Sequence, residues 1–201
     1  MERFEQALIY ASQAHGSQRR KGTQIPYVAH LLAVCALVLE DGGDEDQAVA
    51  ALLHDAVEDQ GGAARLADIR ARFGERVARI VESCTDTDQQ PKPPWLERKR
   101  SYLRHLREAP AEVLRVSCAD KLDNARAILR DFRALGDRVF ERFNPQKADT
   151  LWYYACLANI FRARFPGALA GELARTVRAL REEAAPGLPW PASEEDDPHP
   201  L

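Results

Sequence analysis

The chain has 201 residues, and its 28 lysines and arginines against 31 aspartates and glutamates give a formal net charge of −3. With 45% hydrophobic and 29% charged residues, the composition is typical of a globular domain with a substantial core and excludes a disordered chain. This charge argues against a general nucleic-acid-binding protein, and no apolar run approaches the ~18 residues of a membrane span. The acidic N-terminus without a small-residue cleavage site, and four scattered cysteines among apolar residues, predict a cytoplasmic protein.

Apolar residues recur three or four positions apart along most of the chain, and prolines lie between these stretches rather than inside them. The spacing predicts helices over residues 3–14, 27–40, 46–58, 66–73, 75–84, 95–107, 111–135, 146–165 and 168–184. No segment shows sustained strand alternation bounded by hairpin turns. The sequence therefore predicts an all-α protein of roughly eight to ten helices.

Proline and acid content divide the chain into two parts of unequal length. We expect residues 1–185 to form a single domain, because one domain with a substantial core is typical of this length, with two small domains as the alternative. Residues 186–201 combine five prolines with four consecutive acids, and we expect them to form a disordered, solvated tail.

The densest polar cluster on an apolar background is AALLHDAVED, residues 50–59. On one continuous helix, His54 and Glu58 would stack one turn apart, as would Asp55 and Asp59. Ionisable groups beside an apolar core stripe are costly unless they are neutralised, and a divalent metal ion would neutralise them. The alternative is a helix end whose acids face solvent, with His54 an ordinary core histidine. Two ionisable pairs in succession favour the metal site.

Two further segments could complete a metal site, one around His30 and one around Asp120. Taken singly, His30 could be an ordinary helix-start histidine, and Asp120 could form a buried ion pair with Lys121 or Arg126. With His54 and Asp55 they supply two imidazoles and two carboxylates. Nitrogen and oxygen donors without thiolate favour manganese, iron or magnesium-like octahedral coordination over a closed structural zinc site.

The motifs PYVAH, LLHDAVED and ADKLDN, in the order H…HD…D, resemble those of HD-domain phosphohydrolases. Together with RRKGTQIPYVAH, FGERVARIVESCTD and LERKRSYL, they resemble more narrowly the hydrolase domain of RelA/SpoT-type alarmone enzymes and its stand-alone form, the small alarmone hydrolases. The resemblance runs from about residue 4 to about residue 165. It implies an HD-domain helical bundle.

The resemblance also implies a role for each matching residue. The residues that match the family's metal ligands, usually of Mn2+ although other divalent metals fit, are His30, His54, Asp55 and Asp120. Glu58 and Asp59 match the acidic pair that orients and deprotonates the attacking water.

Substrate contacts are expected from both halves of the chain. Arg20 and Lys21 match residues that stack on the base and hold phosphate, although such a basic run alone would be an ordinary solvated turn. Asn124 matches a residue near the ribose. Lys147 and Tyr154 lie seven residues apart on one predicted helix and could line the same cleft, but aromatic residues at this spacing more often belong to a core.

The implied reaction removes the 3′-pyrophosphate from a guanosine tetra- or pentaphosphate and gives GDP or GTP. Departures from the family pattern at Trp95, Gln60, Asp123 and Ala127 bear on substrate recognition. Another nucleotide, such as the adenosine counterpart or NADPH, is therefore an alternative, and a non-catalytic nucleotide-binding scaffold is a further one. The presence of every expected ligand and both acids favours an enzyme. We expect a small anionic nucleotide as partner, neither nucleic acid nor membrane, with monomer and homo-oligomer both open.

Overall fold

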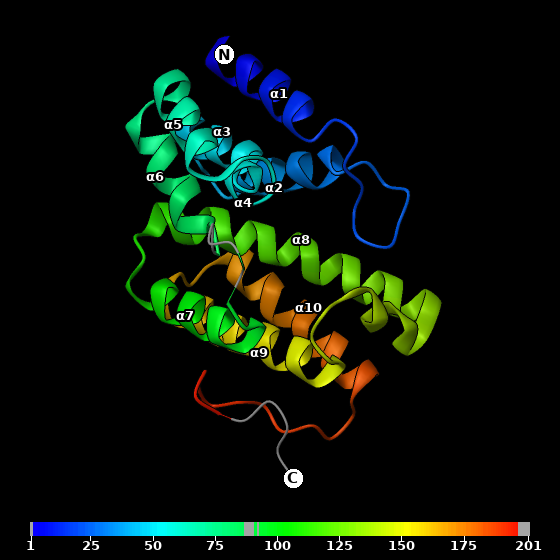
Figure 1. The fold of residues 1–201 in the computed structure, drawn as a ribbon. Helices are drawn as coiled ribbons and strands as arrows, with labels where there is room; N and C mark the ends of the chain where they lie inside the picture. Colours follow the sequence, from blue (N-terminus) through cyan, green and yellow to red (C-terminus); the bar gives the residue numbers. More distant parts are fainter. Residues whose placement is uncertain (1, 87–90, 92, 197–201) are drawn as a thin grey trace. The chain divides into compact units, whose positions relative to one another are not determined.

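The computed structural model describes residues 2–86, 91 and 93–196 (Figure 1). These residues form the α-helices α1 to α10 and one 3-10 segment, η1, so the predicted all-α class is confirmed. By internal contacts the chain divides into two compact units: unit 1 is Met1–Lys92 with Pro110–Asp120, and unit 2 is Pro93–Ala109 with Lys121–Leu201. The single domain expected over residues 1–185 stays a prediction. Within the described ranges, no helix is both long and apolar enough to cross a bilayer.

Unit 1 is built around the short helix α3. Its helices are α1 (Glu2–Ala14), α2 (Val28–Glu40), α3 (Glu45–Leu53), α4 (Ala56–Asp59), α5 (Gly62–Phe73), α6 (Glu75–Cys84) and the first ten residues of α8 (Ala111–Leu135). Helix α3 packs against α1, α2 and α6, and all of its residues from Gln47 to Leu53 are buried. Because α3 is enclosed on every side, the residue that follows it, His54, lies in the interior of the unit.

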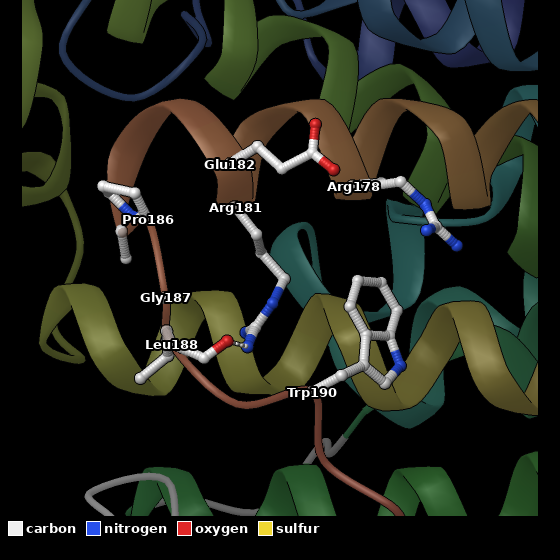
Figure 2. A pocket seen from close by; sticks show the side chains of 8 residues that line it. Arg178, Arg181, Glu182, Pro186, Gly187, Leu188 and Trp190 are labelled. Atoms are coloured by element: carbon white, nitrogen blue, oxygen red, sulfur yellow. Dashed lines mark hydrogen bonds between the residues drawn. The ribbon is translucent and has the colours of Figure 1, made fainter.

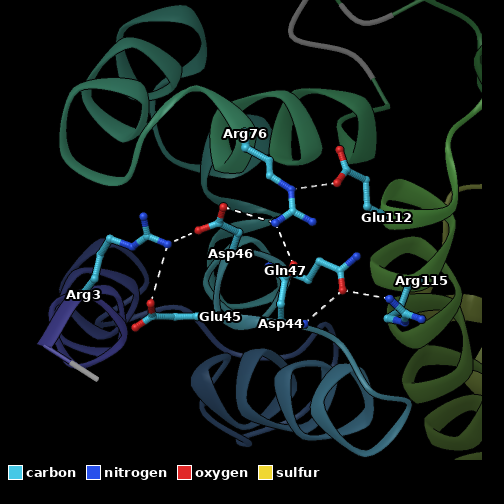
Figure 3. Close-up of polar contacts among 8 residues, drawn as sticks. All are labelled: Arg3, Asp44, Glu45, Asp46, Gln47, Arg76, Glu112 and Arg115. Carbon is cyan, nitrogen blue, oxygen red and sulfur yellow. Dashed lines mark hydrogen bonds and ion pairs between the residues drawn. The ribbon is translucent and has the colours of Figure 1, made fainter.

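The N-terminus of α3 is fixed by a capping box and by arginines from neighbouring helices (Figure 3). The Asp44 carboxylate accepts from the Gln47 backbone N–H at 3.0 Å, and the Gln47 side chain accepts from the Asp44 N–H at 3.2 Å. Arg76 of α6 donates to Asp44 at 2.7 Å and to Glu112 of α8 at 2.8 Å, while Arg115 of α8 donates to Gln47 at 2.8 Å. These contacts join three helices at one end of α3.

Unit 2 is built around α9. Its helices are α7 (Trp95–Glu108), the remainder of α8, η1 (Gly136–Arg142), α9 (Lys147–Arg164) and α10 (Ala168–Ala184). Helix α9 packs against α7, α10 and η1, and its residues from Thr150 to Ala158 are all buried. A helix buried around its whole circumference is typical of the centre of a bundle.

The chain after α10 differs from the expected disordered tail as far as Asp196. Arg181 is 4% exposed, and its guanidinium donates to the backbone carbonyls of Leu151, Leu188 and Pro189 at 3.0, 3.2 and 2.6 Å. Figure 2 shows Arg181 reaching from α10 toward this segment, with Trp190 beside the guanidinium. The guanidinium carbon lies 5.2 Å from the centroid of the Trp190 ring. The charged hydrogen-bond donors of Arg181 therefore hold the backbone of the returning segment.

The acids of this segment meet arginines of α7. Glu194 is buried and accepts two hydrogen bonds from the Arg107 guanidinium, while Arg100 donates to the Glu194 backbone carbonyl at 3.0 Å. Glu195 Oε1 lies 3.5 Å from Arg104 Nη1. The composition of residues 186–201 predicted a solvated tail, because the arginines of α7 that pair with its acids lie far away in the sequence. The part of the expected tail from residue 197 onward lies outside the described residues.

The observed helix limits follow the predicted ones closely where local signals are strong. The limits of α6, α8 and α10 coincide with the predicted ranges 75–84, 111–135 and 168–184. Helix α5 begins four residues before the predicted start at residue 66, and η1 was not predicted. The one substantial error lies at residues 54 and 55, where the predicted helix over residues 46–58 is broken.

Candidate functional site

The break between α3 and α4 has a local cause in the His54 side chain. His54 Nδ1 lies 2.7 Å from the Ala51 carbonyl oxygen. In a continuous α-helix that oxygen would accept from the Asp55 backbone N–H, so the imidazole N–H takes an acceptor from the helical ladder. The prediction of one continuous helix was therefore wrong here. The Asp59 N–H still donates to the Asp55 carbonyl at 3.0 Å, which keeps these two residues one turn apart.

The structure brings together the four side chains predicted to bind metal. His30 comes from α2, His54 and Asp55 from the α3–α4 break, and Asp120 from α8, all within unit 1. His54 Nε2 lies 2.9 Å from Asp55 Oδ2 and 3.7 Å from Asp120 Oδ1. His30 Nε2 lies 3.6 Å and 3.2 Å from the same two oxygens. Two imidazole nitrogens thus face two carboxylate oxygens.

This donor set fits a divalent cation. Metal–ligand bonds of about 2.1 Å place neighbouring donor atoms about 3.0 to 3.4 Å apart. The four distances from imidazole nitrogen to carboxylate oxygen run from 2.9 to 3.7 Å and so include that range. Because His54 donates its Nδ1–H to the Ala51 carbonyl, its Nε2 carries the lone pair of the neutral imidazole. Both histidines and Asp120 are buried, and the side chain of Asp55 is 22% exposed. His30, His54 and Asp55 form a candidate metal-binding group, and Asp120 lies beside it.

The electrostatics of the cluster favour a positive charge. Burial lowers the pKa of His54, but the facing Asp55 and Asp120 carboxylates outweigh it and hold that pKa well above its ordinary value. For Asp55, burial raises the pKa, and the His54 and His30 imidazoles outweigh burial and hold it well below the ordinary value. Carboxylates that stay ionised in a buried site attract a cation strongly.

Tyr27, at the start of α2, orients one of these carboxylates. Its hydroxyl donates to Asp55 Oδ2 at 2.6 Å. Burial and the Asp55 charge raise the pKa of Tyr27, so the phenol remains a protonated donor. The ring also lies edge-on to His30, with 5.5 Å between ring centroids. Tyr27 therefore contacts two of the four clustered residues.

The predicted acidic pair lies on the single turn α4. The Asp59 side chain reaches solvent but stands in a crowded region, and this desolvation together with the Asp55 charge raises its pKa above the ordinary value. Gln18 donates to Asp59 Oδ2 at 2.8 Å. Glu58 Oε2 instead accepts from the Asp86 backbone N–H at 3.4 Å. The two acids are thus adjacent in sequence but held by different partners.

The predicted basic run lies on a hairpin-like loop between α1 and α2. The loop closes through a bridge between Arg19 and Pro26 and through the Tyr27 N–H, which donates to the Gln18 carbonyl at 3.0 Å. Arg20 and Lys21 lie in the turn at the loop's far end, where the Thr23 N–H donates to the Arg20 carbonyl at 2.9 Å. Since Gln18 and Tyr27 at its base contact Asp59 and Asp55, this loop connects the basic run to the acidic pair and to the four clustered side chains.

The other three predicted substrate residues lie in unit 2. Asn124 is half-buried on α8. Lys147 forms an ion pair with Asp137 of η1 at 2.7 Å, and Tyr154 is buried beside Tyr153, with 5.8 Å between ring centroids. These surroundings are typical of residues that stabilise a helical unit, and their substrate role stays a prediction.

The sequence analysis missed Gln18, His15 and Tyr27. Tyr27 stands within the motif PYVAH, three residues before His30, and this position was a usable signal for a residue that supports the clustered side chains. His15 and Gln18 stand ahead of the basic run with two residues between them. Nothing in that spacing alone indicates that the Gln18 side chain contacts Asp59 and His15.

Comparisons with known proteins show which family and which relatives the chain resembles. The family model described as HD domain matches residues 7–159. The chain is 39% identical over 128 residues to guanosine-3′,5′-bis(diphosphate) 3′-pyrophosphohydrolase MESH1 of Xenopus tropicalis, covering 62% of this chain and 69% of that relative. It is 36% identical to the guanosine-3′,5′-bis(diphosphate) 3′-pyrophosphohydrolase of Aquifex aeolicus (strain VF5), of which it spans 18%, with 63% of this chain covered.

A solved structure, described as a metazoan ortholog of SpoT that hydrolyzes ppGpp, has a similar fold. The TM-score is 0.70 at 25% identity, and the match covers 92% of this chain and 97% of that one. A second similar structure, of lmo0812 from Listeria monocytogenes EGD-e, has a TM-score of 0.66 at 31% identity and covers 79% of this chain and 99% of that one.

Proposed function

This chain belongs to the HD domain family, and from that premise we propose that it is a divalent-metal-dependent 3′-pyrophosphohydrolase of alarmone nucleotides. It converts guanosine-3′,5′-bis(diphosphate) to GDP and pyrophosphate, and the pentaphosphate to GTP and pyrophosphate. The observation that carries the proposal is the convergence of two imidazoles and two carboxylates in unit 1. Relatives at 39% and 36% identity that are named for this reaction support it.

We propose Mn2+ as the metal, held by His30, His54, Asp55 and Asp120. When bound, such an ion polarises a phosphoryl oxygen and makes a nearby water more acidic. The chain prepares the site for it in two ways. The Ala51 carbonyl fixes the ring orientation of His54, and the Tyr27 hydroxyl fixes the carboxylate of Asp55.

The acidic pair on α4 would take the proton of the attacking water. The water oxygen bonds to the phosphorus attached to the ribose 3′-oxygen, the bond from phosphorus to that oxygen breaks, and the freed oxygen takes up a proton. Asp59 is the better base of the pair, because its raised pKa makes it a stronger proton acceptor than an ordinary carboxylate. Glu58 stands beside it and orients the water.

The basic loop would hold the substrate's charge. A guanidinium can stack on a base and pair with phosphate oxygens, and Arg20 and Lys21 supply two cations on a loop tied to the acidic pair. We propose Asn124 as a ribose contact, with Lys147 and Tyr154 as further substrate contacts. Lys147 would have to exchange its Asp137 partner for phosphate. The protein would act in the cytoplasm on a small nucleotide.

The experiment that tests this function is a product assay with Mn2+ on ppGpp, pppGpp, ppApp and NADPH, with and without chelator. We expect chelator-sensitive release of pyrophosphate from the guanosine substrates. Pyrophosphate from ppApp alone, or orthophosphate from NADPH, would keep the metal chemistry and overturn the substrate. Metal binding without turnover of any of these nucleotides would contradict the proposed function and favour a binding scaffold.

A further inference from the structure

A short chain of hydrogen bonds leads from the buried core of unit 1 to Asp59. His15 Nδ1 lies 2.7 Å from Gln18 Oε1, and Gln18 Nε2 donates to Asp59 Oδ2 at 2.8 Å. Gln60 Nε2 also donates to Gln18 Oε1, at 2.8 Å. One amide therefore joins a buried histidine to the proposed base.

These partners leave the Gln18 amide only one orientation. An ionised carboxylate only accepts hydrogen bonds, so the amide NH2 of Gln18 must face Asp59. The amide oxygen then faces Gln60 and His15, which must both donate to it. His15 consequently carries its proton on Nδ1 in this contact. Reversal of the amide would place oxygen against the carboxylate and NH2 against NH2, so both contacts would become repulsive.

Gln18 is itself fixed on both sides. Its backbone N–H donates to the His15 carbonyl at 2.9 Å, and its own carbonyl accepts from the Tyr27 N–H at 3.0 Å. His15 is 2% exposed, and its ring stacks on that of Tyr27 with centroids 5.2 Å apart and planes 20° apart. The donor that reaches Asp59 therefore stands on a rigid support.

Asp59 needs such a support because its own helix does little to restrict the side-chain rotamer. Helix α4 has four residues, and Asp59 is the last of them and is exposed. An exposed aspartate on a single helical turn samples several rotamers, whereas a general base has to keep one oxygen within reach of its proton. A hydrogen bond to Oδ2 selects one rotamer and directs Oδ1 away from Gln18.

We propose that Gln18, held by His15, is a positioning residue that fixes the Asp59 carboxylate for proton transfer. The proposal rests on the proposed function, in which Asp59 is the base. Gln18 acts through Asp59, and His15 acts through Gln18. A loss at either position therefore changes the rate of the chemical step more than it changes substrate binding or metal binding.

The decisive experiment is a double-mutant cycle of Gln18→Met and Asp59→Asn, with kcat and KM measured on ppGpp and Mn2+. We expect Gln18→Met to lower kcat about 10- to 100-fold, with KM, Mn2+ affinity and melting temperature close to wild type. In the Asp59→Asn background the same substitution should change the residual kcat less than about twofold, because the group it positions is gone. Gln13→Met, an exposed glutamine on α1, is the matched control.

Two His15 variants separate positioning from packing. Asparagine supplies a donor near the position of Nδ1, so we expect His15→Asn to retain most of kcat. Phenylalanine keeps a ring stacked on Tyr27 but has no donor, so we expect His15→Phe to lower kcat as Gln18→Met does. Unchanged kcat in Gln18→Met, or an equal loss in the Asp59→Asn background, would overturn the positioning role alone. A wild-type protein that releases no pyrophosphate would instead contradict the proposed function.

Discussion

The two ends of helix α3 carry polar clusters of opposite design. At its N-terminus, Arg3, Arg76 and Arg115 pair with the surrounding carboxylates and with Gln47, so the chain supplies both signs of charge (Figure 3). At its C-terminus the contacts join imidazole nitrogens of His30 and His54 to carboxylate oxygens. With neutral imidazoles this second cluster keeps a negative charge that a proton or a metal ion must balance. A cluster completed by the chain stabilises the fold, whereas one whose carboxylates can bind a cation from outside is a candidate functional site.

The largest effect is expected from a substitution in the cluster at the C-terminal end of α3. Asp55→Asn keeps the size of the side chain but removes the negative charge that faces both imidazoles. We expect metal content to fall to near zero and turnover to fall about 1,000-fold or more, equivalent to about 4 kcal/mol of transition-state stabilisation. Metal analysis and pyrophosphate release measure both.

Asp46→Asn is the matched control for that variant, because Asp46 lies at the other end of α3 and pairs with Arg3 and Arg76. It should leave turnover unchanged and lower the free energy of unfolding by less than about 1 kcal/mol. Equal losses of activity in Asp46→Asn and Asp55→Asn would contradict the distinction between the two ends.

The next effect separates metal binding from proton transfer. Glu58→Gln combined with Asp59→Asn preserves shape on α4 and leaves the four clustered residues intact. We expect normal metal content and a loss of turnover of about 100- to 10,000-fold, the usual contribution of a positioned base. Single-turnover rates with saturating Mn2+ measure the loss. Unchanged turnover would remove both residues from the catalytic role.

A smaller effect, on Mn2+ affinity, tests the hydrogen bond that Tyr27 donates to the Asp55 carboxylate. Tyr27→Phe removes the donor to Asp55 Oδ2 and should weaken Mn2+ binding about 10-fold while the ring packing persists. Tyr10→Phe is a matched control, because Tyr10 is also buried and donates to an aspartate, Asp68, at 2.7 Å. Calorimetric titration of both variants measures the affinity. Equal changes in the two would show that loss of any buried tyrosine hydroxyl has this effect.

What the sequence predicted well depends on local information. Helices α6, α8 and α10 begin and end as their apolar spacing and flanking residues indicate. The clustered histidines and aspartates were also predictable, because their residue types and order carry the donor chemistry. The family of the chain followed from the same motifs.

What the sequence did not predict depends on contacts between distant residues. The break before α4 arises from a side chain that takes a backbone acceptor, which helical periodicity does not encode. The contact between Arg107 and Glu194 spans 87 positions, so composition alone suggested a solvated tail. The partner of Lys147, Asp137, lies on the unpredicted η1. Gln18 reaches Asp59 across 41 positions for the same reason.

The smallest expected effect is the pH dependence of the stabilisation that Asp44 contributes at the N-terminus of α3. Burial raises the pKa of Asp44, but the Gln47 N–H and Arg76 outweigh burial and hold it below the ordinary value. Because the folded-state pKa is the lower one, unfolding takes up a proton in acid. The stabilisation from Asp44 is therefore present above its ordinary pKa of about 3.9 and is lost as pH falls through the folded-state value.

Asp44→Asn tests this, because asparagine keeps the capping acceptor and loses the charge. The Asp44 side chain is 51% exposed, so we expect a loss of less than about 1 kcal/mol at pH 7, reduced further by salt. The difference in unfolding free energy between wild type and variant should be constant from pH 7 to about pH 5 and shrink toward zero below about pH 4. Urea unfolding with chelator present measures it without a contribution from bound metal. A difference that grows in acid would mean that Asp44 is destabilised by its surroundings, and α3 would then carry uncompensated acids at both ends.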